Sequence, residues 1–308
     1  RRGTRSRAGF TLAELIVATA IAGIAAAAMT MTLSRQQRFF ASTSAILDVR
    51  GQIRDGADVL VSDIRSAAVA RFGLPVMTDS AIEMFTTVAT SVACSAPVGA
   101  TIGLPPQILA RGNTLTSILF LPDTGDIAML YAASTIRDSS RWESARILSF
   151  ASRAIASSCP ASTGFTSAGD ASAGSSGYMV TLAQPPTAAI REGAPIMFLR
   201  RVRYSLYRSS DGEWYLGYRR CNAATGVCAA IQPVSGPYRA YSASAGLSGL
   251  SLRYYDELGT ELTSPSNAVA RVDIAMRGQT SRPASLSGDS RTAYRDSIVV
   301  SVSPRNRQ

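Results

Sequence analysis

The sequence contains few types of side chain that can act in catalysis or bind a metal. All 31 positively charged side chains in the 308 residues are arginines, and the sequence contains neither lysine nor histidine. This excludes serine–histidine and cysteine–histidine catalytic pairs, imidazole metal ligands, Schiff-base lysines and the lysine of a phosphate-binding loop. Catalysis by carboxylates alone, as in glycoside hydrolysis, stays open. We find no convincing catalytic group and predict that the protein is not an enzyme and uses no cofactor.

Two groups of carboxylates resemble parts of known sites. Asp123 and Asp126 flank a glycine in PDTGD, and the DTG phrase occurs in aspartic proteases, but no second such loop is present. Asp256, Glu257 and Glu261 lack the strict spacing of a calcium-binding loop. We therefore predict a β-turn at the first group and a charged hairpin turn at the second, with no metal at either.

The sequence has four cysteines: Cys94, Cys159, Cys221 and Cys228. Their number is even and none has CxxC spacing, which in an exported domain favours two disulfides with three possible connectivities. We predict the pairs Cys221–Cys228 and Cys94–Cys159. The alternative is a set of free buried thiols in a cytosolic protein, which the apolar segment described below argues against.

A segment at residues 200–220 mixes arginine with tyrosine and tryptophan around an Asp211-Gly212 turn signal. Arg200, Arg201 and Arg203 are candidate contacts to nucleic acid, since cationic and aromatic side chains track a single strand. The net charge is +10, but four of these charges lie in the first nine residues. We favour the simpler interpretation, a twisted hairpin that has one aromatic face directed to the core and one arginine-rich face exposed to solvent.

Residues 10–33 form an almost uninterrupted apolar run, FTLAELIVATAIAGIAAAAMTMTL. As a helix it spans roughly 36 Å, enough to cross a hydrocarbon core of ~30 Å. Arginines precede it, and Arg35 and Arg38 follow it, so the positive-inside rule places the C-terminal bulk outside the cytoplasm. A secretory signal peptide has a shorter apolar region and a small-residue cleavage site, and a plain anchor does not account for Glu14.

Glu14 is the informative residue of this run. A carboxylate inside a membrane helix costs about 2.5–3.5 kcal/mol on insertion scales, so it usually has a partner. It lies one turn after Phe10, whose free α-amine would be a cation beside this glutamate or a neighbour's. Such pairing across chains would set the axial register of an assembly. The alternative is a carboxylate near the membrane surface that simply reaches water.

The stretch RAGFTLAELIVATAIAGI resembles the prepilin leader and N-terminus of type IV pilins and type II secretion pseudopilins. The resemblance implies cleavage after Gly9 by a prepilin peptidase, N-methylation of Phe10 and an assembly role for Glu14. The proline that many major pilins carry later in this helix is absent, which fits minor pilins and pseudopilins better. The sequence begins with arginine instead of methionine, so its recorded start is expected to be truncated.

After residue 35 the apolar residues recur at steps of three and four, which predicts an amphipathic helix. Its expected buried face consists of Ile46, Val49, Ile53, Ala57, Leu60, Ile64 and Ala67. Gly51 and Gly56 weaken this helix, and Gly73 with Pro75 ends it. A single helix over residues 10–71 would be roughly 90 Å long. The segments at 58–68 and 248–262 resemble PilW-type minor pilins and J-type minor pseudopilins.

The pattern of the remaining residues predicts strands separated by turns. We predict α+β, pilin-like: one long N-terminal helix, transmembrane in its first half, packed on an antiparallel β-sheet domain. The expected divisions are a leader at 1–9, a transmembrane and assembly helix at 10–34, an amphipathic continuation at 35–72 and a β-rich extracytoplasmic globular domain at 73–308. The expected strands are 82–90, 117–121, 127–132, 178–182, 195–207, 213–220, 250–255, 268–276 and 297–302, with loops at 157–177 and 279–290.

These expectations predict a minor pilin or pseudopilin that initiates or caps a type IV pilus or type II secretion pseudopilus. The expected partners are other minor and major pilins or pseudopilins, prepilin peptidase, the inner-membrane assembly platform and membrane lipid. The expected location is the bacterial inner membrane, with a single pass, and then the filament tip, where a bulky subunit packs more easily than along a shaft. The alternative is a binding module on the same scaffold for DNA uptake or surface adhesion.

Overall fold

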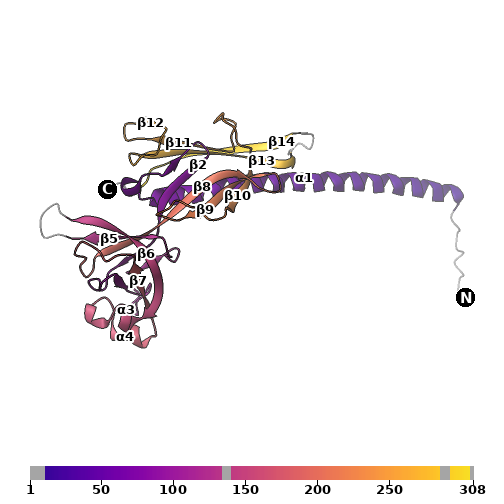
Figure 1. The fold of residues 1–308 in the computed structure, drawn as a ribbon. Coiled ribbons are helices and arrows are strands. Elements are labelled where there is room, and N and C mark those ends of the chain that lie inside the picture. The colour runs from indigo at the N-terminus through magenta and orange to yellow at the C-terminus, as the bar shows by residue number, and fades with distance from the viewer. Residues whose placement is uncertain (1–10, 134–139, 285–291, 306–308) are drawn as a thin grey trace, which may run out of the picture. The chain divides into compact units, whose positions relative to one another are not determined.

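The computed structural model describes residues 11–133, 140–284 and 292–305. One long helix, α1 (Leu12–Ser66), is followed by a β-rich region in which every other helix is short (Figure 1). The chain divides into two compact units, one of residues 1–51 and 279–296 and the other of residues 52–278 and 297–308. The predicted α+β, pilin-like architecture is confirmed.

Among the described residues, the β-rich region has fourteen strands in a single hydrogen-bonded network. The short helical elements are α2 (Val69–Phe72), α3 (Ile155–Ser158), η1 (Ala161–Thr163) and α4 (Ala168–Ser172). The strands are β1 (Val76–Met77), β2 (Ala81–Val92), β3 (Thr101–Leu104), β4 (Ser117–Ile118), β5 (Ile127–Ala132), β6 (Arg141–Ala154), β7 (Ser176–Leu182), β8 (Pro195–Arg208), β9 (Trp214–Cys221), β10 (Gln232–Tyr238), β11 (Leu250–Tyr255), β12 (Glu261–Leu262), β13 (Arg271–Pro283) and β14 (Ala293–Val302).

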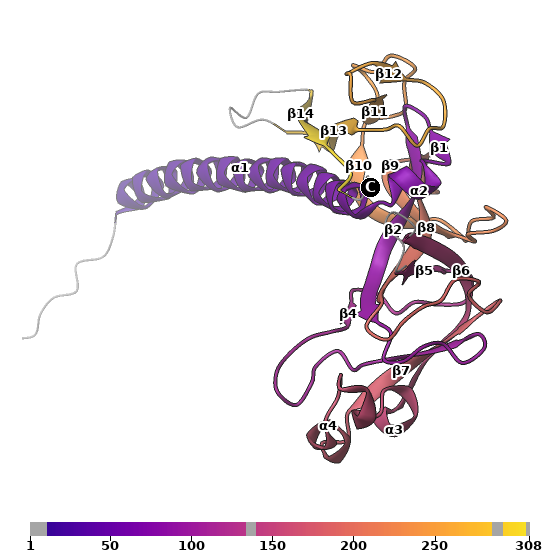
Figure 2. The same ribbon diagram turned by 90° about the vertical axis from the view of Figure 1, so that its left-hand side faces the viewer.

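The network runs in the order β12-β11-β13-β10-β9-β8-β5-β6-β7-β3. β14 pairs with β13, and β2 pairs with β1, β4 and β8. β8 is the central element, because it pairs antiparallel with β2, β5 and β9. Figure 2 shows α3 and α4 beside β7. The position of β8 explains why its residues meet side chains from several distant segments.

The predicted buried face of the amphipathic helix is confirmed. All seven of its residues are buried, with exposed fractions of 5% or less: Ile46, Val49, Ile53, Ala57, Leu60, Ile64 and Ala67. The polar side chains on the opposite face, such as Arg54, Asp55 and Asp58, are exposed. Burial of this apolar stripe is therefore what holds the second half of the helix in place.

The helix ends earlier than the expected position near residue 71. Ala67 forms a bridge with Thr86 of β2, and the Ala68 N–H donates to the Phe85 carbonyl at 2.9 Å. These sheet-type hydrogen bonds replace the next helical ones, so α1 stops at Ser66 and a separate turn, α2, follows. Gly73, at φ 62°, then closes α2 by donating its N–H to the Val69 carbonyl.

Gly56 allows α1 to lie close to β10. A Cβ at this position would collide with the Tyr238 hydroxyl and the Ser235 Oγ. The same Tyr238 hydroxyl donates to the Gln52 carbonyl at 2.8 Å, and the Gly236 N–H donates to the Gln52 Oε1 at 3.0 Å. Burial raises the pKa of Tyr238 to about 12. The glycine that weakens the helix locally is therefore required by its tertiary contact.

Within the first unit, α1 contacts the start of β14. The Arg50 guanidinium forms an ion pair with Asp296 at 2.9 Å and donates to the Tyr294 hydroxyl at 2.8 Å. The guanidinium carbon lies 5.6 Å from the centre of the Tyr294 ring. These contacts join the helix to a strand 246 residues away along the chain.

Both predicted disulfides are present. Cys94 and Cys159 are joined, with their Cα atoms 5.3 Å apart, and Cys221 is joined to Cys228. Cys94 and Cys159 are completely buried, in the part of the chain whose core is formed by β2, β3, β5, β6, β7 and β8. The long Cys94–Cys159 link therefore connects β2 to the segment that follows β6.

The strand predictions were correct for β5 and β11 to the residue and located β2, β4, β7, β8, β9, β13 and β14, with different ends. Several strands were missed, most notably β6, whose side chains are largely half-exposed or exposed and show no clear alternation. The loop predicted at 279–290 was partly wrong, because β13 continues to Pro283, and residues 285–290 of it lie outside the described residues. The loop predicted at 157–177 contains η1 and α4.

Candidate functional sites: the apolar helix and an arginine–aspartate cluster

The first part of α1 exposes nearly all of its large apolar side chains. Within the described residues, α1 is the one helix long and apolar enough to cross a membrane by length and composition. Its exposed apolar residues include Leu12, Leu15, Ile16, Val17, Ile21, Ile24, Met29, Met31 and Leu33. A helix that is apolar all round needs an apolar surrounding, so this segment has the properties of a membrane-embedded helix.

Glu14 lies in a capping box at the start of α1. Its carboxylate accepts from the Thr11 N–H at 2.9 Å and from the Thr11 hydroxyl at 3.0 Å, and the Glu14 N–H donates to the Thr11 Oγ1 at 3.3 Å. Thr11 is the residue before the helix and Glu14 is its third residue, the positions of this motif. This local role of Glu14 was not predicted from the sequence. The predicted processing residues Gly9 and Phe10 lie outside the described residues.

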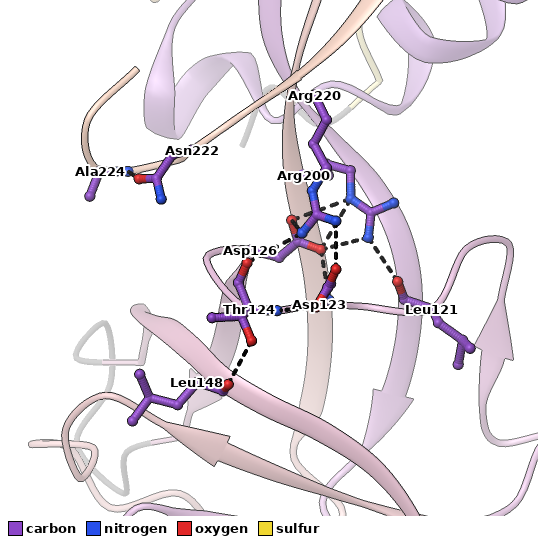
Figure 3. Close-up of polar contacts among 9 residues, drawn as sticks. All are labelled: Leu121, Asp123, Thr124, Asp126, Leu148, Arg200, Arg220, Asn222 and Ala224. Carbon is purple, nitrogen blue, oxygen red and sulfur yellow. Dashed lines mark hydrogen bonds and ion pairs between the residues drawn. The ribbon is translucent and has the colours of Figure 1, made fainter. Parts of the chain in front are cut away.

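Arg200 is the centre of a polar cluster that extends from the buried Asp126 to the exposed Asp123 (Figure 3). It lies on β8, and its guanidinium forms an ion pair with Asp126 at 2.8 Å and donates to the Leu121 carbonyl at 2.7 Å. Asp126 is 2% exposed. Arg220 of β9 reaches the same carboxylate at 3.3 Å and binds Asp123 at 2.7 Å. Two cations are therefore matched by two anions.

The PDTGD segment supplies both carboxylates. The Asp126 N–H donates to the Asp123 carbonyl at 3.0 Å, which confirms the predicted β-turn. The Asp123 N–H donates in return to the Asp126 carboxylate at 3.0 Å, and the Thr124 hydroxyl donates to the Leu148 carbonyl at 2.8 Å. The hydrogen bond from Arg220 is the main reason that the pKa of Asp123 lies below its ordinary value. The turn thus positions its aspartates against the arginines.

The other two arginines proposed as nucleic-acid contacts differ from one another. Arg201 forms an ion pair with Glu83 of β2, which is 2% exposed, and lies over the Phe85 ring. Arg203 has no ion pair among the described residues. The prediction of separate aromatic and arginine faces is wrong for Arg200, because Arg200 and Tyr204 lie on the same face of β8 and are both buried. Of the three arginines, Arg203 is therefore the one without an anionic partner in the part of the chain that the structure describes.

A second polar contact lies near this cluster and was missed in the sequence. The Tyr204 hydroxyl donates to the Asp63 carboxylate at 2.6 Å. Burial raises the pKa of Asp63, and the hydrogen bond from Tyr204 partly opposes this effect. The sequence placed Asp63 only on the polar side of the helix. Its position at an i+3 step from the buried Leu60 was the available signal that it lies near the edge of the packed face.

A group of possible metal ligands, Glu83, Cys221 and Cys228, lies within 4.8 Å. The two sulfurs are joined in a disulfide, so neither is a thiolate, and the Glu83 carboxylate is bound by Arg201. This group therefore does not fit a metal ion. The turn at Asp256 accepts the N–H groups of Leu258 and Thr260 on its own carboxylate, as expected for a hairpin turn.

The family comparison concerns the N-terminal segment. The model of the prokaryotic N-terminal methylation motif matches residues 4–30. A search of curated proteins found no match. The matched motif, which is prepilin-type, supports assignment to the type IV pilin and pseudopilin superfamily. With its pilin-like fold and the one long apolar helix of its described residues, the chain fits a pilin-type protein anchored in the inner membrane by one pass. Proteins of this class are generally structural, are processed by prepilin peptidase and assemble with other pilins.

Proposed function

We propose that this protein is a minor pilin or pseudopilin that assembles with other pilins to initiate or cap a type IV pilus or type II secretion pseudopilus. The observation that carries the proposal is the match of the methylation motif to residues 4–30, directly at the start of an exposed apolar helix. The large β-rich region supports a place at the filament tip, since a bulky subunit packs poorly along a shaft. The polar contacts described above are structural and need no catalytic role.

In this proposal, prepilin peptidase cleaves after Gly9, and the new N-terminus, Phe10, is methylated. The partners are other minor and major pilins or pseudopilins, the inner-membrane assembly platform and membrane lipid. Glu14 acts in assembly, because its carboxylate lies in an apolar surrounding where a cation from a neighbouring chain would offset the cost of its charge. The capping contact with Thr11 leaves that charge in place, since neither Thr11 donor is a cation.

The test measures the intact mass and N-terminal chemistry of the protein from membranes, together with its co-purification with other pilins. We expect a mature chain that begins with methylated Phe10. Glu14→Gln removes the charge but still closes a capping box, because glutamine also serves at this position. Thr11→Ala is the matched control, since it removes the capping partner and keeps the charge.

If charge pairing drives assembly, Glu14→Gln loses its partners and Thr11→Ala retains them. Loss with Thr11→Ala alone would assign the effect to helix capping. A chain that stays uncut, or that is cut after the apolar segment, would contradict the pilin proposal. The alternative of DNA uptake gains no support from Arg200 and Arg201, because their charges are matched by Asp126 and Glu83.

A further inference from the structure

A cavity of about 620 Å³ lies between the end of α1, β2, β8, β9 and the segment before β5, all within the second unit. This volume is within the range of sites that bind small molecules. Most of its wall is apolar, formed by Val59, Val88, Leu119, Phe120 and Val202. Leu119 and Phe120 are 74% and 65% exposed, which is high for large apolar side chains. The cavity therefore offers apolar surface that the described chain leaves open.

The polar groups of the cavity leave one charge without a counter-charge. Arg200 and Arg220 line it, but both are ion-paired to Asp126, and Arg220 also to Asp123. Asp63 lines it as well, and its contact among the described residues is the neutral Tyr204 hydroxyl on Oδ2. The Asp63 Oδ1 has no hydrogen-bond donor among those residues. The uncompensated charge of the cavity is therefore negative.

Two tyrosine rings line the cavity together with this carboxylate. Tyr204 and Tyr218 face each other across β8 and β9, with ring centres 5.4 Å apart at an angle of 58°. The Tyr218 hydroxyl makes no hydrogen bond within the described part of the chain, and Phe120 also lines the cavity. A carboxylate among aromatic rings is an arrangement that attracts organic cations, by charge and by cation–π interaction.

We propose that this cavity binds a small organic cation with an apolar body, its ammonium group at Asp63 and the Tyr218 hydroxyl and its body against Val59 and Phe120. A neutral apolar ligand would cover Asp63 and leave its charge unpaired, which is costly. An anion would meet the same carboxylate, while the nearby guanidiniums are already occupied. The proposal does not depend on the assembly function, because it rests on the second unit alone.

The test measures binding of benzylammonium to the full chain in lipid nanodiscs, by saturation-transfer NMR with empty nanodiscs as reference. Benzyl alcohol is the neutral probe of matched size, and benzoate is the anionic one. Asp63→Asn removes the charge and keeps an oxygen that accepts from Tyr204. Asp58→Asn is the matched control, because Asp58 lies exposed on the same helix outside this cavity. Phe120→Ala alters the apolar wall at an exposed position.

We expect benzylammonium to bind at least about tenfold more tightly than either other probe, equivalent to about 1.4 kcal/mol. Asp63→Asn should remove this preference, Phe120→Ala should weaken binding, and Asp58→Asn should leave it unchanged. Equal binding of benzyl alcohol, tighter binding of benzoate, or an unaffected Asp63→Asn protein would overturn the proposal. Absence of benzylammonium binding up to about 10 mM, the range of weak ligands, would also overturn it.

Discussion

The Tyr204 hydroxyl on β8 donates a 2.6 Å hydrogen bond to Asp63 on α1, across 141 residues of sequence. Burial raises the pKa of both groups, so this contact joins a neutral phenol to a carboxylate that is held partly out of water. It fixes the last turns of α1 against the central strand of the network. The other carboxylate oxygen of Asp63, Oδ1, has no hydrogen-bond donor among the described residues, and Asp63 lines the cavity.

Loss of the Tyr204 hydroxyl should destabilise the folded domain. Tyr204→Phe leaves the Asp63 carboxylate without its donor, and an unsatisfied group of this kind costs about 1–3 kcal/mol. The measurement is urea unfolding of the detergent-solubilised chain, followed by tryptophan fluorescence. Tyr218→Phe is the matched control, because that hydroxyl makes no hydrogen bond to the described residues, and its effect should stay below about 0.5 kcal/mol. An equal loss of stability in Tyr204→Phe and Tyr218→Phe would show that the hydrogen bond to Asp63 does not stabilise the fold.

Asp63 should make the stability depend on pH. Its folded pKa lies above the ordinary value of 3.8, so its contribution to stability is full below pH 3.8 and is lost as pH rises through the folded pKa. Asp63→Asn removes this titration. The unaltered protein should therefore lose stability relative to Asp63→Asn from pH 3.8 upwards, until the difference becomes constant above the folded pKa. Urea unfolding of both proteins across this range tests the sign, and a slope in the other direction would show a lowered pKa.

The two glycines of the amphipathic helix should respond oppositely to alanine. A Cβ at Gly51 meets no atom within 4 Å, so Gly51→Ala should stabilise the helix by about 0.5–1 kcal/mol. A Cβ at Gly56 collides with Tyr238 and Ser235, so Gly56→Ala should destabilise by about 1–3 kcal/mol through overpacking. Thermal unfolding of both variants makes the comparison. Stabilisation by Gly56→Ala would mean that the close approach to β10 is absent.

Removal of Arg200 should be costly, and removal of Arg203 should not. Arg200→Ala leaves the buried Asp126 with the longer contact to Arg220 as its remaining ion pair, beside the Asp123 N–H, and breaking such a pair costs about 3–5 kcal/mol. Arg203 lies on the same strand without an ion pair among the described residues, so Arg203→Ala should change stability by about 0.5 kcal/mol or less. The free energies of unfolding of the two variants, measured by chemical denaturation, test this difference. A small loss for Arg200→Ala would show that water or Arg220 replaces the pair.

Local patterns predicted several features well. The recurrence of apolar residues at helical spacing identified the buried face from Ile46 to Ala67, because such a pattern arises from one helix packing on one side. The Asp123–Asp126 turn and the short Cys221–Cys228 link were also accessible, since each involves residues close in sequence. β6 was not, because its exposed and half-exposed side chains lack the alternation that reveals a strand.

The sequence by itself determined the apolar helix, the methylation motif and the α+β class, because length, composition and periodicity are properties of contiguous residues. Only the tertiary structure decided which charges are available. Arg200 and Asp126 lie 74 residues apart, and both were interpreted alone, one as a nucleic-acid contact and the other as part of a turn. The fold brings Asp126 against Arg200 of β8, and each charge neutralises the other. Asp63 is an ordinary polar helix residue in the sequence, and the fold leaves its charge uncompensated. Coulomb energies depend on distance in space and on burial, and the fold sets both.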